Sequence, residues 1–212
     1  MIIIKHIVCN MLQENCYIVS DESREAIVID CGAYYESERQ MIIKYINDKQ
    51  LALRHVICTH AHFDHCFGNA TLWRQYQICP SLPLGDKEIA DIDIQMRMMM
   101  GTGYNEEQAP VSFYNINDSF KFGSHCLTVI ATPGHSPGSC CLYCAEERML
   151  FTGDTLFCQS IGRTDLEGGN WADMQKSLQI LAQMPIDTCI MPGHGPQTTI
   201  DHELQSNPYL AV

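Results

Sequence analysis

The sequence predicts an α/β fold, in which helices cover β-sheets. Short apolar runs typical of strands recur along the chain, helical patterns lie between the later runs, and no linker or low-complexity segment divides them. A hydrophobic content of 46% in 212 residues is enough for a substantial buried core. We therefore expect residues 1–212 to form a single domain.

Short apolar runs are the predicted strands, and the first of them follow one another closely, as hairpin strands do. The predicted strands are Ile2–Val8, Cys16–Ser20, Ala26–Asp30, His55–Cys58, Leu127–Ala131, Ser139–Cys144, Met149–Phe151 and Thr188–Met191. The later strands are separated by segments with helical periodicity or by long loops. The predicted helices are Glu36–Asp48, Phe67–Gln75, Asp86–Met100, Ala172–Met184 and Ile200–Ser206.

Composition and charge exclude some classes of partner. The formal net charge of −12 opposes binding to nucleic acid and to anionic membranes, and two bound divalent cations would still leave about −8. The apolar start MIIIKHIV is short and has no cleavage site after it, and no apolar run approaches the roughly 20 residues of a membrane span. We expect a cytoplasmic protein that acts on a small-molecule substrate and binds neither nucleic acid nor a membrane.

The chain has 12 cysteines, and their spacing is not that of a disulfide framework. Several lie within or beside predicted strands, where a reduced thiol packs like a small hydrophobic side chain: Cys16, Cys31, Cys58, Cys126, Cys140, Cys141 and Cys189. The C-x-x-C sequence at 141–144 has no second pair and is expected to pack in the core. A reducing compartment suits this composition.

Methionines gather near the end of the predicted helix Asp86–Met100, at Met96, Met98, Met99 and Met100. Such a cluster can line an adaptable apolar pocket, but packing of the helix on the core is the expectation. The segment 81–113 carries no motif, and we expect it to contribute a loop to the substrate pocket.

Residues of metal-ligand type crowd the stretch Thr59–His65, whose sequence is THAHFDH. His60 and His62 follow a predicted strand, and in an extended segment residues two apart point the same way, so they could grip one ion. Asp64 and His65 are adjacent and project differently, so they could serve a second ion. A solvated loop would more often carry Lys, Glu, Ser or Asn.

Three later turns each place one such residue just after a predicted strand: His135 in TPGH, Asp154 in TGDT and His194 in PGHGP. Gly and Pro fix such turns, and strand ends are where α/β proteins build their sites. Together, the histidines and aspartates suit two borderline cations such as Zn²⁺, with Fe²⁺ and Mn²⁺ as other candidates, and a carboxylate could bridge them.

A single histidine in a turn is usually only a polar surface residue. His6, His55, His125 and His202 are expected to be of that kind, or to be hydrogen-bonded within strands. Asp154 alone could be a turn-forming residue. The crowded THAHFDH stretch, followed by His or Asp at three strand ends, favours a metal site over chance.

These residues resemble the signature of the metallo-β-lactamase superfamily, which is H-x-H-x-D-H followed by His, Asp and His in separate loops. The match is complete and in order from Thr59 to Pro196. Within the superfamily the chain is similar to the glyoxalase II-like hydrolases, especially the short bacterial hydroxyacylglutathione hydrolase-like type, in TPGHSPG (132–138), FTGDTLF (151–157), GRTD (162–165) and PGHGP (192–196). The resemblance implies a four-layer αββα sandwich with a dimetal site at one edge of the sheets.

The resemblance also implies roles for individual residues. His60, His62 and His135 would hold one ion, Asp64, His65 and His194 a second, and Asp154 would bridge them. The implied activity is that of a metal-dependent hydrolase, a thioesterase of glyoxalase II type in which a hydroxide shared by the metals attacks the thioester carbonyl. Asp64 would be catalytic by orienting that nucleophile, and Arg163 is expected to pair with Asp165.

Two departures from relatives bear on specificity. The best-known dizinc β-lactamases usually have a Cys near the position of Asp154, which counts against β-lactamase activity. Long glyoxalase II enzymes bind glutathione through basic residues of a C-terminal extension, whereas residues 201–209 here contain no Lys or Arg.

Other functions of the same fold are the alternatives. Persulfide dioxygenases share the GRTD type of motif and hold a single iron, here through His60, His135 and Asp154. A lactonase would use the full dimetal set. The net charge opposes a nuclease or phosphodiesterase, and the complete ligand set opposes a scaffold with an inactive site.

Overall fold

Two six-stranded sheets form the centre of the molecule. The computed structural model describes residues 1–104 and 107–210. The first sheet consists, in spatial order, of β1 (Ile3–Cys9), β2 (Glu14–Ser20), β3 (Glu25–Ile29), β4 (Ala52–Ile57), β5 (Ser81–Pro83) and β6 (Ser112–Tyr114). The second consists of β14 (Thr198–Thr199), β13 (Cys189–Pro192), β10 (Met149–Gly153), β9 (Cys140–Cys144), β8 (His125–Ala131) and β7 (Ser119–Phe122). A small hairpin joins β11 (Leu156–Phe157) and β12 (Ser160–Ile161).

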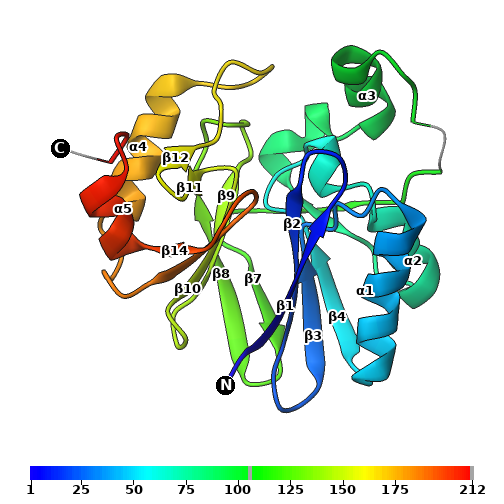
Figure 1. Cartoon of the computed structure of the whole chain (residues 1–212). Helices are drawn as coiled ribbons and strands as arrows, with labels where there is room; N and C mark the ends of the chain where they lie inside the picture. The colour runs from blue at the N-terminus through cyan, green and yellow to red at the C-terminus, as the bar shows by residue number, and fades with distance from the viewer. Residues whose placement is uncertain (105–106, 211–212) are drawn as a thin grey trace.

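Helices cover the outer face of each sheet (Figure 1). Helices α1 (Glu36–Asp48) and α2 (Asn69–Tyr76) lie on the side of the first sheet, and α4 (Trp171–Leu181) and α5 (Ile200–Ser206) on the side of the second. Helix α3 (Ile92–Met100) lies near one end of the sheets. The order of helix, sheet, sheet and helix confirms the α/β class and the four-layer αββα sandwich. The single domain expected for residues 1–212 stays a prediction.

Strand β2 shows how the sequence produces these layers. All seven of its residues are buried. Because successive side chains of a strand point to opposite faces, Tyr17 and Val19 enter the core between the sheets, whereas Cys16 and Ile18 pack in the cluster that contains Ile42 of α1. A continuous apolar run is what a strand covered on both faces requires.

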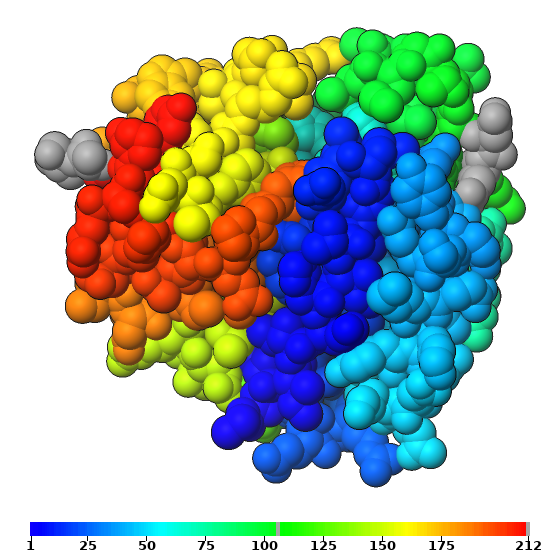
Figure 2. Space-filling model, viewed as in Figure 1, coloured from blue at the N-terminus to red at the C-terminus, as the bar shows by residue number. Residues whose placement is uncertain are grey.

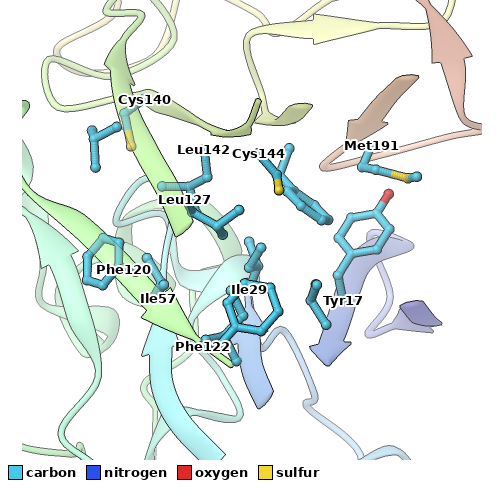
Figure 3. Packing of buried hydrophobic residues seen from close by; sticks show 14 of the residues in the cluster. Tyr17, Ile29, Ile57, Phe120, Phe122, Leu127, Cys140, Leu142, Cys144 and Met191 are labelled. Carbon is cyan, nitrogen blue, oxygen red and sulfur yellow. The ribbon is translucent and has the colours of Figure 1, made fainter. Parts of the chain in front are cut away.

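The core between the sheets brings distant segments together (Figure 3). Tyr17 and Ile29 of the first sheet pack in one cluster with Phe122 and Leu142 of the second. Burying one such side chain is worth roughly 1.5–3 kcal/mol. This shared core fixes the two sheets against each other and so fixes the loops at their edges.

The structure corrects one predicted helix. Asp86–Met100 is not continuous, because the 3₁₀ helix η2 (Leu84–Ile89) ends before α3 begins. The Asp91 carboxylate accepts from the backbone N–H groups of Asp93 and Ile94 and so caps a new helix. The sequence pattern also does not predict the short strands β5, β6, β7, β11, β12 and β14, because two to four residues are too few for a periodic signal.

The methionine cluster divides between two environments. Met96 is buried in a core cluster, as expected. Met98, Met99 and Met100 are exposed, so the expectation of core packing is wrong for them. Their helix is too short, and too far out at the end of the sheets, to bury more than one face.

The structure bears on two expectations from composition, the state of the cysteines and the presence of a membrane-spanning helix. All 12 cysteines are free thiols, and the two of the C-x-x-C sequence are buried in β9, which confirms core packing. Among the described residues no helix combines the length and the apolar character needed to cross a membrane.

Candidate metal centre

The loops that carry the predicted ligands meet at one edge of the sandwich. Strands β8, β10 and β13 run in the same direction, because β8 and β10 are both antiparallel to β9 and β10 is parallel to β13. The loop after β4 joins them, since the N–H of Cys140 donates to the carbonyl of Thr59 at 3.0 Å. The structure therefore brings together all of the predicted residues: His60, His62, Asp64, His65, His135, Asp154 and His194.

Six of these residues form two groups of three. The first trio is His60, His62 and His135, and the second trio is Asp64, His65 and His194. In each trio, one ligand atom from every residue lies within 4.8 Å of the other two. This is the grouping that the resemblance implies for two separate ions.

Asp154 lies between the two trios. Its Oδ1 is 3.3 Å from Nε2 of His65, and its Oδ2 is 3.4 Å from Nε2 of His135 and 3.6 Å from Nε2 of His194. A side chain on Gly193 would collide with Asp154 Oδ1, so glycine is needed there for this close approach. One carboxylate thus contacts both trios, as a bridging ligand must.

Several ligand atoms have lone pairs or protons with no partner. His60 Nε2 is buried and has no hydrogen-bond partner among the described residues, and neither His65 Nε2 nor Asp154 Oδ1, which lie 3.3 Å apart, is oriented for a hydrogen bond with a described residue. His62 Nδ1 and His135 Nε2 face each other at 2.8 Å. Buried polar atoms are normally satisfied, and imidazole nitrogens with carboxylate oxygens suit borderline divalent cations. The residues present therefore fit two metal ions.

The opposite ring nitrogens of three histidines are held by oxygen atoms. His135 Nδ1 lies 2.7 Å from the carbonyl of Arg163, and His194 Nδ1 lies 3.1 Å from the carbonyl of Leu12. His60 Nδ1 lies 3.1 Å from Thr59 Oγ1. An Nδ1–H that donates to oxygen leaves the Nε2 lone pair free for a metal, so these contacts select the ligating tautomer.

Asp30, which lies in no motif of the sequence, contacts residues beside both trios. Its carboxylate accepts from the backbone N–H of Thr59 at 2.7 Å and from the Thr59 hydroxyl at 2.8 Å. Its Oδ2 also lies 3.2 Å from Nδ1 of His65. An acid directly after the strand β3 is the same signal that identifies Asp154, but the predicted strand Ala26–Asp30 places Asp30 inside the strand and not after it.

Asp86 ties the loop of the first two histidines to the loop of His135. Its carboxylate accepts from the N–H groups of Ala61 and Gly138 and from the Ser136 hydroxyl. Gln95 joins the first of these loops to α3, since its amide donates to the carbonyl of Ala61 at 2.7 Å and accepts from the N–H of Phe63 at 3.0 Å. Neither residue lies in a motif, so only the folded chain identifies them.

The first residues of β2 hold the loop of His194. The Asn15 side chain donates to the carbonyls of Pro192 at 2.9 Å and Gly195 at 2.8 Å. Glu14, its neighbour, is fully buried, and its carboxylate has no hydrogen-bond partner among the described residues and lies 3.9 Å from His65 Nδ1. Burial raises the pKa of Glu14 well above its usual value.

Burial and charge set the protonation of the ligands. Burial lowers the pKa of His60 well below its usual value and, together with His135, lowers the pKa of His62 to about 4. Burial alone would raise the pKa of Asp154, but the His65 imidazole outweighs it and holds that pKa well below its usual value. Burial by itself lowers the pKa of His65, but the carboxylates of Asp154 and Asp64 outweigh it and raise that pKa well above its usual value. His60, His62 and Asp154 are therefore in the forms that bind metals, whereas His65 must release a proton to do so.

A hollow of about 430 Å³ opens above the two trios. Beside the ligands its wall is mainly apolar and includes Leu12, Phe63, Met99, Met100, Phe157, Ile161 and Leu166. Figure 2 shows it between the yellow segment of β11 and β12, the green α3 and the dark blue loop after β1. Arg163 lines the hollow too and, as expected, pairs with Asp165 through two contacts of 2.8 and 2.7 Å.

Comparisons with known proteins identify the class. The Metallo-beta-lactamase superfamily profile matches residues 9–194, and the chain belongs to this superfamily. The "Probable metallo-hydrolase YqgX" of Bacillus subtilis is 32% identical over 203 residues, which covers 94% of this chain and 93% of that protein. The "Hydroxyacylglutathione hydrolase GloC" of Haemophilus influenzae is also 32% identical over 203 residues and covers 93% of each chain.

Solved structures agree with this assignment. The BLEG-1 B3 metallo-beta-lactamase superposes with a TM-score of 0.89 at 31% identity and covers 99% of this chain and 100% of that one. TTHA1623 in a di-iron-bound form gives 0.86 at 31% identity over 97% and 100%. ETHE1 from Myxococcus xanthus gives 0.77 at 25% identity over 99% and 84%.

Proposed function

We propose that the chain is a cytoplasmic dimetal thioesterase of glyoxalase II type that acts on a small-molecule acyl thioester. The observation that carries the proposal is the carboxylate of Asp154, which contacts both trios. The similarity to a hydroxyacylglutathione hydrolase supports a thioester substrate. Zinc suits the donor set, and the di-iron form of a similar structure supports iron as well.

The residues of the site divide the work of hydrolysis. Two divalent cations, held by the two trios and Asp154, would activate water at neutral pH and would stabilise negative charge on the substrate carbonyl oxygen. Asp64, whose Oδ2 lies 3.4 Å from His194 Nε2, orients the attacking water in addition to its ligand role. Water adds to the thioester carbon, the C–S bond breaks, and a carboxylic acid and a thiol are released. A thiolate leaves readily, so the site needs no separate general acid.

The test combines metal content with turnover. We expect about two zinc or iron ions per chain in protein purified without added metal, together with hydrolysis of S-lactoylglutathione. Two ions without turnover of any thioester would contradict the thioesterase and would leave a hydrolase of another ester, such as a lactone. A β-lactam belongs in the same panel, because a B3 metallo-beta-lactamase is among the similar structures.

A mononuclear-iron dioxygenase is the second candidate. Persulfide dioxygenases of this fold hold iron through two His and one Asp, and His135 lies 3.4 Å from Asp154 here. The GRTD motif at 162–165, which resembles that of the persulfide dioxygenases, favours this candidate, whereas the complete second trio favours two ions. One iron per chain with oxygen uptake on a persulfide would establish it in place of the thioesterase.

A further inference from the structure

The wall beside the candidate metal centre is apolar on the side of the first trio. A second hollow of about 180 Å³ adjoins the first, and His62, Met99 and Leu166 line both. Ile89 and Met98 extend this wall away from the metal centre. A substrate whose carbonyl lies over the trios therefore has an apolar recess directly beside its reacting carbon.

The polar side chains of this recess are already engaged or carry the wrong charge. Gln95 uses its amide on the loop backbone, with contacts of 2.6 and 2.7 Å to the carbonyls of Ile89 and Ala61. Arg163, the one cation among the described residues that line the two hollows, is bound to Asp165. Glu167, at the same recess, repels an anion. No Lys or Arg among the described residues lines the smaller hollow, so nothing there favours an anionic acyl group.

We propose that this enzyme selects thioesters with an apolar acyl group, which packs against Met99 in the smaller recess. This inference rests on the proposed thioesterase function. Methionine side chains are flexible and adapt to acyl groups of differing shape. Met99 is 46% exposed, so a bound acyl chain would remove apolar surface from water. The exposed methionines of α3, which do not pack in the core, would thus contact the acyl group of the substrate.

The test is a chain-length series that needs no variant. We expect kcat/KM of the metal-loaded enzyme to rise by about two- to fourfold for each added methylene from acetyl through butanoyl to hexanoyl thioesters, until the recess is full. The lactoyl thioester should fall below butanoyl. Each acyl group is offered on glutathione and on the uncharged N-acetylcysteamine, so that an effect of the carrier is separated from an effect of the acyl group.

A pair of variants locates the effect. Met99→Gln should lower kcat/KM for the hexanoyl thioester by about tenfold and flatten the series. Met41→Gln is the matched control, because Met41 is 49% exposed on α1 and lines neither hollow. A series that is flat or falls with length, while lactoyl thioesters turn over, would overturn the apolar acyl group but keep the thioesterase. Failure of every thioester with two ions bound would overturn the proposed function itself.

Discussion

The two ends of the sandwich carry the same residue types and use them differently. At the metal-centre end, β8 leads to His135 and β10 leads to Asp154. At the other end, β8 begins at His125, Glu147 precedes β10, and Asp21 follows β2. Each end therefore brings histidine and carboxylates together in a largely buried setting.

The difference lies in which atoms are satisfied. His125 is engaged on both ring nitrogens, at 3.0 Å from Asp21 and 3.1 Å from Glu147. At the metal-centre end, the Nε2 atoms of His60 and His65 have no hydrogen-bond partner among the described residues. A satisfied histidine joins segments of the chain, whereas converging unsatisfied ligand atoms require a cation. Substitutions of candidate ligands at the metal-centre end should therefore lower the metal content, whereas substitutions at the opposite end should not.

Removing the shared carboxylate should have the largest effect. Asp154→Ala takes away a carboxylate that lies 3.3 to 3.6 Å from histidines of both trios, so we expect both ions to be bound weakly. Activity should fall by more than the roughly 100-fold that the loss of an outer partner costs. Elemental analysis per chain is the measurement, and Glu147→Ala, at the opposite end, is the control with unchanged metal. If Asp154→Ala keeps one ion at full occupancy, Asp154 does not bridge.

Removing a candidate ligand from one trio should lower the occupancy of one ion more than that of the other. His62→Ala removes an imidazole from the first trio, so metal content should fall by about one ion per chain and hydrolysis should be lost with it. The exposed His202→Ala should retain both ions. Full metal content in His62→Ala would remove His62 from the ligand set.

Substitution of Asp86 tests whether metal binding by the first trio depends on the hydrogen bonds that Asp86 makes to the two loops. Asp86→Ala leaves donors of Ala61, Ser136 and Gly138 without their acceptor, which should cost about 2–3 kcal/mol of folding free energy. Affinity for the first ion should fall by about 10–100-fold. Thermal unfolding and competition with a chelator measure the two effects. Normal affinity with lowered stability would show that the loop holds its shape without this carboxylate.

Asn15 gives the corresponding test of the second trio. Asn15→Ala removes two hydrogen bonds to the loop of His194, so affinity for the second ion should fall by about tenfold while the first ion stays bound. Asn115→Ala, at an exposed position, is the matched control. Equal weakening of both ions would mean that the start of β2 supports the whole metal centre and not the second trio alone.

The sequence predicts the candidate ligands, which lie in recognisable motifs. It does not predict the residues that support them, which lie outside those motifs. All seven predicted residues converge because each follows a strand, and strand ends are readable from apolar runs. Asp86 and Gln95 act through backbone groups of another loop, and no spacing along the chain encodes such a contact. The break in the helix predicted over 86–100 is also missed; it lies at Ala90 and Asp91, where η2 ends and Asp91 caps α3.

The smallest effect on metal content is expected for Asp21, at the end of the sandwich opposite the metal centre. There, pH should change the folding stability and leave the metal content unchanged. Burial by itself raises the pKa of Asp21, but hydrogen bonds from Ser23, Ser124 and His125 outweigh it and hold that pKa well below its usual value. A carboxylate with a lowered folded-state pKa stabilises the fold above its unfolded pKa of about 4, and that contribution is lost as pH falls further.

Asp21→Asn should therefore lower the unfolding temperature at pH 7 by roughly 4–8 °C, from about 2 kcal/mol. The gap from the unsubstituted protein should narrow below about pH 4, with metal content unchanged at pH 7. Thermal unfolding across pH measures the gap, and elemental analysis checks the metal. Loss of an ion in Asp21→Asn would contradict the comparison, because it would make this end of the sandwich part of the metal centre. A gap independent of pH would show instead that Asp21 acts through packing and not through its charge.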